Sequence, residues 1–189
     1  MIIGLCGAQG SGKDTVANIL VSKYGFIRIS FATALKDVVA ILFSWPRKML
    51  EGDTPESRTW REAPDAEWSL KTGIAGFSPR KALQIVGTDL IRNHIYANLW
   101  IDIVEKQIAT ILSANPKAKI VVSDCRFTNE VAAIKKNPGA RLLQILRQER
   151  ESGTHLSETA DLSASIDIML INNNTIEALE ISLGVVIDH

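Results

Sequence analysis

The sequence predicts an α/β fold in which helices flank a mostly parallel sheet on both faces. Short apolar segments rich in Ile, Val and Leu recur along the chain, as in strands that are buried on both sides. Segments with apolar residues at helical spacing separate them, which favours parallel crossovers. The 189 residues are enough for one domain with insertions, and 46% hydrophobic and 22% charged residues are typical of globular proteins.

The elements alternate in order along the chain. The first strand is apolar and partly β-branched, and glycines follow it at once. Val16, Ile19 and Leu20 then share one face of a helix. Ser78 and Pro79 are typical of a helix start. We expect strands at 1–6, 26–30, 120–123, 141–146 and 166–171, and helices at 13–23, 34–43, 79–86, 88–112 (broken near Tyr96), 129–136 and 175–183.

Residues 44–78 differ in character from the rest of the chain. Prolines and glycines punctuate the segment, and it holds three of the four tryptophans, Trp45, Trp60 and Trp68. Structureless loops of this length are uncommon in compact domains. We therefore expect an insertion with its own small aromatic cluster, within a single domain that spans residues 1–189.

Charge, hydropathy and cysteine content exclude several classes of protein. Lys plus Arg and Asp plus Glu both number 21, and this net charge of zero does not support binding to a nucleic-acid polymer. No apolar run approaches the roughly 18 residues of a membrane span, and no signal-like stretch follows Met1. Cys6 and Cys125 cannot form a disulfide scaffold. We expect a cytoplasmic protein (in the host cytoplasm if the source is a virus) without a membrane partner, and the oligomeric state, including a homodimer, stays open.

Residues 7–13 read GAQGSGK, which matches the G-x-x-x-x-G-K pattern of a P-loop. A predicted strand precedes the pattern and a predicted helix follows it, as the motif requires. Glycines let the backbone curl around an anion, while inward N–H groups and the helix N-terminus supply positive charge. Lys13 can then reach the β- and γ-phosphates of a nucleotide. The alternative is a glycine-rich turn that only caps a helix.

The motif departs from the usual pattern directly after the lysine. Asp14 stands where a Ser or Thr normally contacts Mg²⁺, and Thr15, which follows, is placed to donate to an α- or β-phosphate. Asp14 could hold the metal directly or through its water, or contact another group while the metal depends on Asp124. An acid that only stabilises the helix N-terminus is the remaining alternative. We expect the ATP contacts of this segment from Gly10, Ser11, Gly12, Lys13, Asp14 and Thr15.

Other P-loop classes fit the sequence poorly. A GTPase needs an N-K-x-D run and a D-x-x-G switch, and the chain has neither. Motor and strand-separating ATPases are generally larger and more basic. A small-molecule kinase remains, with a compact core, an acceptor-side insertion at 44–78 and a lid-like segment at 147–163.

Four blocks occur in one order: GKDT at 12–15, LQIVGTDLIRN at 83–93, SDCRFTNE at 123–130 and THLSE at 154–158. Together they resemble the phage-type deoxynucleoside monophosphate kinases over nearly the whole chain. The resemblance implies a P-loop kinase fold with ATP as co-substrate, Mg²⁺ as cofactor and a deoxynucleoside monophosphate as acceptor, which becomes the diphosphate. It does not say which bases are accepted, because the segment that should shape the acceptor pocket looks shorter than in some relatives.

The SDCRFTNE block places two charged groups at the end of a predicted core strand, where open α/β sheets bind their ligands. Asp124 could hold Mg²⁺ through water or position an arginine, and Arg126 could reach the acceptor phosphate and act in catalysis. A local surface ion pair is the alternative for both. Glu130 fits the surface of the following helix or a partner of an arginine.

The block around residues 80–89 is expected, by resemblance, to form part of the acceptor pocket. Arg80 and Gln84 form an i, i+4 pair on one helical face. An arginine fork matches a monophosphate, while Gln84 and Asp89 can read base edges or a sugar hydroxyl. Thr88 is also expected in this pocket, and the alternative is that it only caps a helix. Trp100 could stack on a base, with a place in the core as the alternative.

Further candidates follow the other strands. Lys36 lies where nucleotide kinases meet the acceptor, although a solvated helix start fits it equally well. Arg147 and Arg150 lead into the lid-like segment, where cations could neutralise the transferring group or, for Arg147, stack on adenine. Asn172 and Asn173 could contact adenine or simply form a turn. His155 is expected to be a hydrogen-bonding group of the lid rather than a zinc ligand.

The sequence therefore predicts an ATP-dependent kinase that phosphorylates deoxynucleoside 5′-monophosphates by direct transfer of the γ-phosphoryl group. Two alternatives stay open: a P-loop kinase for another small phosphorylated metabolite, and a nucleotide-binding module without turnover. The predicted catalytic residues are Lys13, Arg126 and Arg147; ATP is bound by residues 10–15, Arg147 and Asn173; the acceptor is bound by Lys36, Arg80, Gln84, Thr88, Asp89, Trp100, Asp124, Arg126 and Arg150; and Mg²⁺ is held by Asp14 and Asp124, directly or through water.

Overall fold

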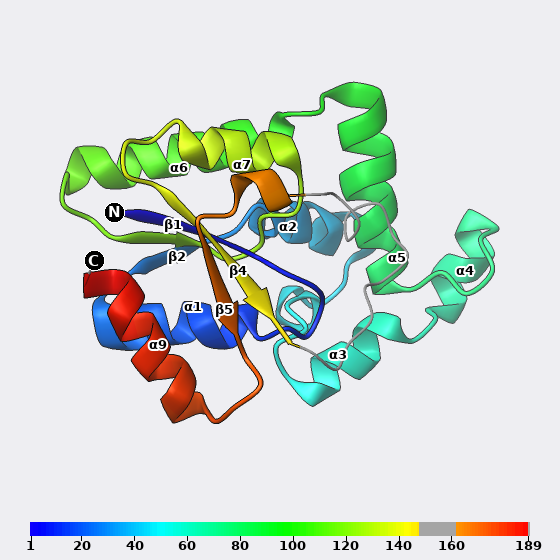
Figure 1. The fold of residues 1–189 in the computed structure, drawn as a ribbon. Coiled ribbons are helices and arrows are strands. Elements are labelled where there is room, and N and C mark those ends of the chain that lie inside the picture. The colour runs from blue at the N-terminus through cyan, green and yellow to red at the C-terminus, as the bar shows by residue number, and fades with distance from the viewer. Residues whose placement is uncertain (148–161, 189) are drawn as a thin grey trace. The chain divides into compact units, whose positions relative to one another are not determined.

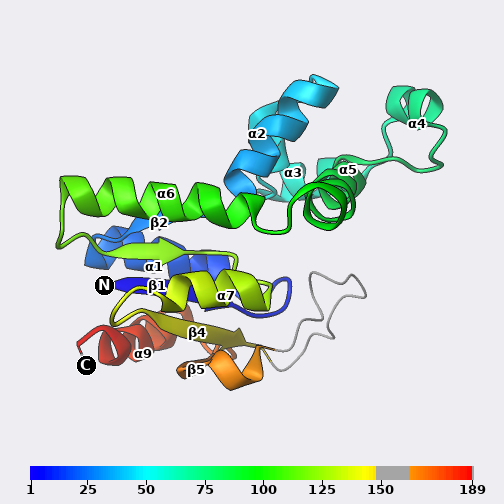
Figure 2. The same cartoon turned by 90° about the horizontal axis from the view of Figure 1, so that it is seen from above.

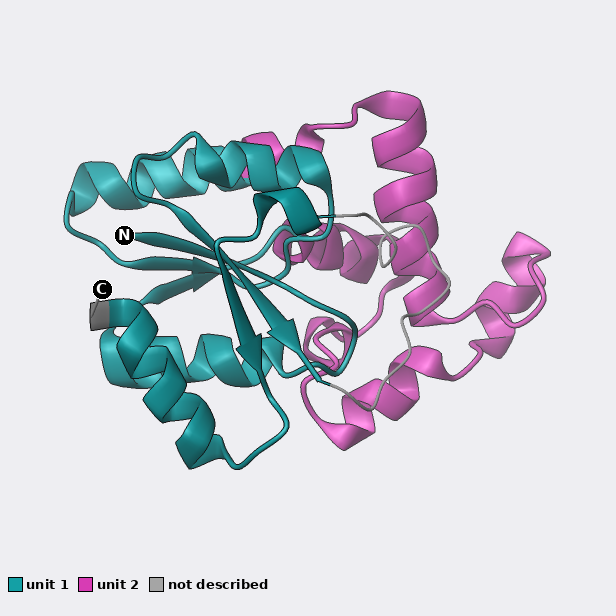
Figure 3. Cartoon of the chain, in the orientation of Figure 1, with its two compact units in different colours: residues 1–31, 104–189 teal, residues 32–103 magenta. Residues whose placement is uncertain are grey.

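The computed structural model describes residues 1–147 and 162–188 (Figure 1). It divides into two compact units, residues 1–31 with 104–189, and residues 32–103 (Figure 3). The 44–78 segment lies within the second unit. Among the described residues, none of the helices has the length and apolar character that a membrane span needs.

The first unit is built on a parallel sheet, which confirms the predicted fold class. In the described residues the sheet has five strands in the order β2-β3-β1-β4-β5, and each strand pairs in parallel with its neighbours. All five predicted strands are present. Their bounds are β1 Ile2–Cys6, β2 Ile27–Ile29, β3 Ile120–Val122, β4 Arg141–Leu146 and β5 Ile168–Ile171.

Strand β1 is the centre of this sheet and is buried along its whole length. Its Gly4 pairs with Val122 on one side and with Leu142 on the other. The chain therefore leaves β1 toward β2 and β3 on one side and later returns to β4 and β5 on the other. Such a reversal opens a crevice beyond the carboxyl ends of the strands, where α/β proteins bind ligands.

Helices cover both faces of the sheet. Helices α1 (Lys13–Tyr24) and α9 (Ile176–Asp188) lie on one face, with residues 104–114 of α6 (Leu99–Ala114) and α7 (Thr128–Lys135) on the other (Figure 1). Helix α7 contacts β1 and β4, and Figure 2 shows it lying alongside them. A short 3₁₀ turn, η3 (Ser163–Ser165), precedes β5. The fully buried core side chains between the layers include Leu5, Val16, Leu20, Leu143 and Leu183.

The second unit is helical. It contains α2 (Ala32–Phe43), η1 (Arg47–Leu50), α3 (Pro55–Glu62), α4 (Ala66–Thr72), α5 (Pro79–Gln84), η2 (Ile85–Ile95) and the start of α6. Side chains cap the starts of three of these helices, as the polar residue before each helix would suggest. Thr54 accepts from the N–H of Ser57 (3.1 Å), Asp65 from that of Trp68 (2.9 Å), and Ser78 from that of Lys81 (3.3 Å).

An aromatic cluster holds this unit together, as predicted for the 44–78 segment. The rings of Phe43 and Trp45 are stacked with centroids 4.6 Å apart, and Trp68 meets Phe43 edge-on at 4.8 Å. Trp60 meets Trp45 edge-on at 5.9 Å, and Phe77 contacts both Phe43 and Trp45. The Trp45 indole N–H also donates to Asp65 at 3.0 Å, and that of Trp68 donates to the carbonyl oxygen of Phe43 at 3.2 Å, so both indoles keep a hydrogen-bond partner in the cluster.

The helices after Ser78 differ from expectation in one respect. Helix α5 passes directly into η2, a π-helix, with no break between residues 86 and 88. A helix cap at Thr88 is therefore wrong, because Thr88 lies in the interior of η2. The predicted break near Tyr96 is confirmed, since η2 ends there in an extended residue and α6 begins at Leu99. Single π-type turns are commonly found at functional sites.

Glu130 is a buried acid in the first turn of α7. Its expected place on the helix surface is wrong, because only 3% of the residue is exposed. The carboxylate accepts the backbone N–H groups of Arg126 (2.8 Å) and Phe127 (3.1 Å), which a helix start would otherwise leave without partners. Glu130 therefore fixes the backbone just after Asp124.

Replacing Glu130 with Ala should lower the free energy of unfolding by about 2–3 kcal/mol, because two backbone N–H groups at the helix start lose a buried, charged acceptor. Urea denaturation measures the change. Lys136→Ala is the matched control: Lys136 lies just beyond the other end of α7, is paired with Glu105 at 3.0 Å and is largely exposed. The control should stay within about 0.5 kcal/mol of wild type. Equal effects of the two variants would contradict a capping role for Glu130.

Candidate active site

The predicted phosphate loop lies between the central strand β1 and helix α1. Gly7, Gly10 and Gly12 have φ angles of 140°, 77° and 106°, a region that other residues rarely adopt. A Cβ atom on Gly7 would also lie 2.4 Å from the carbonyl oxygen of Ile145. The N–H of Ser11 donates to the carbonyl of Ala8 at 3.2 Å, which closes the turn. The loop conformation therefore requires glycine at these positions.

Lys13, the first residue of α1, reaches back over this loop. Its Nζ donates to the carbonyl oxygens of Gly7 (2.6 Å) and Ala8 (2.7 Å). Burial lowers the pKa of Lys13, and the positive charge of Arg126 lowers it further, while Asp14 and Asp124 act in the opposite direction. The positive charges of Lys13 and Arg126 thus act on one another, and a polyanion would relieve this repulsion.

The remaining loop residues also suit a phosphate ligand. Ser11 is 2% exposed, and within the described part of the chain its Oγ has no hydrogen-bond partner. Thr15 is half-buried on the first turn of α1. The helix N-terminus adds its partial positive charge to that of Lys13. The loop therefore combines free donors, close backbone approach and positive charge.

Asp14 takes part in an ion pair that the sequence analysis missed. Its carboxylate, which is 74% exposed, pairs with Arg28 of β2. Arg28 also donates to Asn18 of α1 and, with its Nε, to Ser123 after β3, both at 3.1 Å. One guanidinium thus ties the start of α1 to the ends of two strands. The only signal in the sequence was an arginine in the middle of a short apolar strand.

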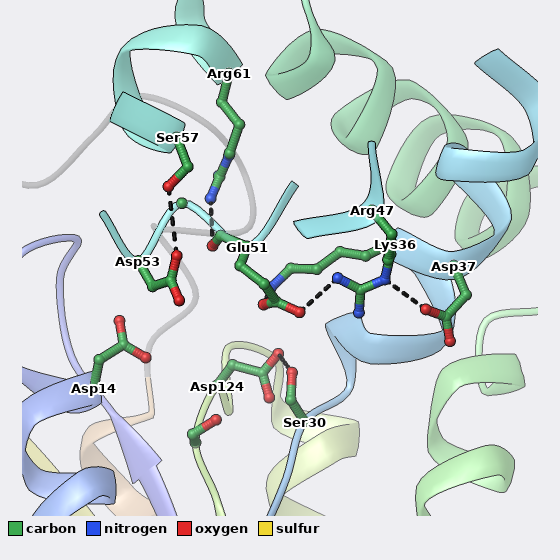
Figure 4. Close-up of polar contacts among 12 residues, drawn as sticks. Asp14, Ser30, Lys36, Asp37, Arg47, Glu51, Asp53, Ser57, Arg61 and Asp124 are labelled. Atoms are coloured by element: carbon green, nitrogen blue, oxygen red, sulfur yellow. Dashed lines mark hydrogen bonds and ion pairs between the residues drawn. The ribbon is translucent and has the colours of Figure 1, made fainter. Parts of the chain in front are cut away.

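Asp124 lies beyond the carboxyl end of β3, the neighbour of β1. Its Oδ1 accepts the N–H of Phe31 at 2.9 Å. Its Oδ2 accepts the hydroxyl of Ser30 at 2.8 Å (Figure 4). These bonds hold the carboxylate in one orientation at the edge of the sheet that carries the phosphate loop. Arg126, two residues further on, is exposed.

The carboxylates fit a magnesium ion that a nucleotide brings with it. The described residues contain no group of three or more His, Cys, Asp or Glu side chains that could hold a metal by itself. Mg²⁺ usually keeps several waters and takes one or two carboxylates together with substrate phosphates. Asp124, oriented by Phe31 and Ser30, suits this role, and Asp14 suits it less directly because Arg28 already pairs with it.

The second unit contains a separate charged network (Figure 4). Glu51 accepts from Lys36 and from Arg47, each at 2.5 Å, and Arg47 also donates to Asp37 at 2.5 Å. Lys36, one of the predicted acceptor-binding residues, is only 15% exposed at its side chain. Burial acts to raise the pKa of Glu51, but its bonds to Lys36 and Arg47 outweigh burial and hold the pKa below its usual value.

The other predicted acceptor residues lie on α5, η2 and α6. Arg80 pairs with Glu62 at 3.3 Å, and Gln84 ends the same helix, α5. Trp100 is 5% exposed, and its indole N–H donates to the carbonyl of Gly87 at 3.1 Å. This placement favours the core alternative for Trp100 over base stacking. Thr88 is half-buried and Asp89 is exposed, both on η2.

The two units divide the predicted site residues between them. The first unit holds the phosphate loop, Asp124, Arg126, Arg147 and Asn173, and the second holds Lys36, Arg80, Gln84, Thr88, Asp89 and Trp100. Arg147 is exposed just after β4, and Asn173 is exposed just after β5. Arg150, His155 and most of the predicted lid at 147–163 lie outside the described residues.

Replacing Glu51 with Gln should destabilise the second unit by about 1 kcal/mol at neutral pH, because Lys36 and Arg47 lose a charged partner at a half-exposed site. The folded-state pKa of Glu51 is depressed, so its contribution is complete above the usual value of 4.5 and is lost as the pH falls through the lower folded value. Denaturation midpoints of wild type and variant should therefore converge in acid.

Glu67→Gln is the matched control for this experiment. Glu67 pairs with Lys71 on α4 but is 69% exposed. The Glu67→Gln substitution should change the denaturation midpoint little, both at neutral pH and in acid. If the difference between wild type and the Glu51 variant persisted unchanged into acid, the ionised carboxylate would not be its source.

Comparisons with known proteins give matches to nucleotide kinases. A family model described as deoxynucleotide monophosphate kinase matches residues 65–183. A protein of Acanthamoeba polyphaga mimivirus with the name "Putative deoxynucleotide monophosphate kinase" is 38% identical over 186 residues, covering 94% of this chain and 91% of the relative. The "Deoxynucleoside-5'-monophosphate kinase" of Escherichia phage T5 is 26% identical over 179 residues, covering 69% of this chain and 70% of the relative.

The fold is shared with a solved bacterial protein. TT1252 from Thermus thermophilus superposes with a TM-score of 0.54 at 22% sequence identity, over 100% of this chain and 96% of the other. The resemblance drawn from the sequence blocks is therefore confirmed by independent comparison. The chain is a kinase enzyme that acts on nucleotides, and it belongs to the deoxynucleotide monophosphate kinase family.

Proposed function

We propose that this kinase transfers the γ-phosphoryl group of ATP to a deoxynucleoside 5′-monophosphate and releases the diphosphate. The observation that carries the proposal is the position of Lys13. Its ammonium lies over the glycine loop, 2.6 Å from the carbonyl oxygen of Gly7, with the charges of Arg126 and Asp124 acting on it. A polyphosphate tail in this loop would have its terminal group beside both cations and the oriented carboxylate.

The roles follow from what phosphoryl transfer needs. The attacking oxygen belongs to the acceptor phosphate, so no protein nucleophile is required, and catalysis rests on position and charge. The amides of residues 10–15 and Lys13 hold the ATP phosphates. Arg126 and Arg147, with Arg150, neutralise the negative charge that spreads over the transferring group. Mg²⁺, when bound with ATP near Asp124 and Asp14, would supply further charge neutralisation.

The acceptor side of the proposal rests on the second unit. Lys36 and Arg80 offer cations to the monophosphate, while Gln84, Thr88 and Asp89 offer polar groups to the base or the sugar. Lys36 and Arg80 already hold carboxylate partners, Glu51 and Glu62, so their side chains are oriented before an anionic substrate arrives. Asn173 is proposed to contact the base of ATP, and Trp100 supports the unit through its packing.

Replacing Lys13 with Ala should preserve the fold and reduce turnover roughly 10²-fold or more, about 3 kcal/mol, since the ammonium stabilises charge on the transferring group. Turnover is measured at saturating ATP and acceptor, with circular dichroism as the check on folding. Lys23→Ala is the matched control, because Lys23 lies on the same helix α1 but pairs with Glu180 at 2.6 Å. Turnover of the Lys13 variant near that of wild type would count against the proposal.

A panel of acceptors tests the substrate class. Wild-type enzyme with ATP and Mg²⁺ is offered dTMP, dGMP, dCMP, dAMP and the matching ribonucleotides, together with phosphorylated sugars, and ADP formation is followed by a coupled assay. We expect turnover with at least one deoxynucleoside monophosphate. Turnover with a phosphorylated sugar but with none of the nucleotides would show that the acceptor is not a nucleotide. ATP binding without turnover of any acceptor would contradict the proposed kinase reaction.

A further inference from the structure

An asparagine after the last strand contacts the phosphate loop. Strand β5 ends at Ile171, and the side-chain amide of Asn172 donates from Nδ2 to the carbonyl oxygen of Ser11 at 2.8 Å. The two residues are 161 positions apart in the sequence but lie in the same unit. Because a carbonyl oxygen only accepts, the amide nitrogen must face it, which settles the orientation of the Asn172 side chain.

Asn172 is itself anchored to the sheet. Its backbone N–H donates to the carbonyl oxygen of Leu146, the last residue of β4, at 2.7 Å. Strand β4 pairs directly with β1, from which the loop emerges. The side chain of Asn172 therefore connects the loop to a rigid part of the core rather than to another loop.

This bond controls a peptide plane within the loop. A trans peptide is planar, so its C=O and N–H groups point in opposite directions. When Asn172 holds the Ser11 carbonyl, the N–H of Gly12 in the same plane points away from Asn172. Backbone N–H groups of such loops are the donors that surround a bound phosphate. The orientation of one of these donors thus depends on a side chain from outside the motif.

Gly12 shows how closely Asn172 approaches. A Cβ atom on Gly12 would lie 2.2 Å from the Asn172 Nδ2 atom, well inside contact distance. The glycine is therefore needed both for its φ of 106° and to admit the asparagine. The contact is a packed part of the loop structure.

We propose that Asn172 is a positioning residue of the phosphate loop, which fixes the Ser11–Gly12 peptide so that the Gly12 N–H serves the polyphosphate tail of ATP. The inference rests on the proposed use of this loop for ATP. It gives Asn172 a role that concerns the phosphates and is independent of the base.

The test measures binding of ATP and of inorganic tripolyphosphate to the wild type and to Asn172→Ala by calorimetry. One neutral hydrogen bond corresponds to about 3- to 10-fold in affinity, and both ligands should lose this factor equally because they share the tail. Asn172→Asp should lose more, since it keeps the size but places a carboxylate against a carbonyl and near the phosphates. Asn172→Gln, which keeps the amide donor, should recover part of the loss.

Kinetics give a second readout. KM for ATP should rise by the same factor in Asn172→Ala, while KM for the acceptor stays unchanged. Asn174→Ala is the matched control, because Asn174 is an exposed neighbour in the same turn. Thermal unfolding without ligand checks that each variant folds, and all variants keep the backbone bond from residue 172 to Leu146.

Three results would overturn the inference. Unchanged affinity for both ligands would mean that the bond does not position the loop. If Asn172→Ala lowered the affinity for ATP but not the affinity for tripolyphosphate, Asn172 would contact the base and not position the loop. A lower melting temperature with unchanged affinities would leave only a structural role. If the wild type binds ATP and tripolyphosphate but phosphorylates no deoxynucleotide, the proposed reaction fails while the role of Asn172 is still decided by binding.

Discussion

The candidate active site depends on a sharp turn that the backbone makes between a fully buried strand and a helix. Strand β1 lies between β3 and β4 in the sheet. After β1 the chain turns sharply next to the carbonyl oxygen of Ile145, where a Cβ atom on Gly7 would not fit. Gly7 and Gly12 make that passage possible. Because of this turn, the loop lies at the N-terminus of α1, where its backbone amides can bind an anion. The position of Lys13 follows from the same turn.

Charged side chains from segments far apart in the sequence lie at this edge of the sheet. Asp124 is oriented by the residues that follow β2, and the backbone of Arg126 is fixed by the buried carboxylate of Glu130. Arg28 holds Asp14 at the start of α1. Asp124 and Asp14 are therefore held by partners outside their own sequence motifs, and fixed charges of this kind are what electrostatic catalysis at the proposed site requires.

Regular patterns in the sequence predicted most of the fold. All five strands were predicted because their segments are short and apolar, and the phosphate loop was predicted because its glycines and lysine follow one of them. The aromatic cluster followed from three tryptophans in one segment. The π-helix η2 was not predicted, because its residues have the spacing of an ordinary α-helix.

By itself, then, the sequence determined the sheet, the phosphate loop and the family, because these depend on local patterns and on residues close together in the chain. Only the tertiary structure decided which partners hold the site: Arg28 for Asp14, Glu51 for Lys36, and Asn172 for the loop. Asn172 and Ser11 are 161 positions apart, and no local pattern connects them. Such contacts arise from the order of strands in the sheet, which brings the end of one strand to the end of another.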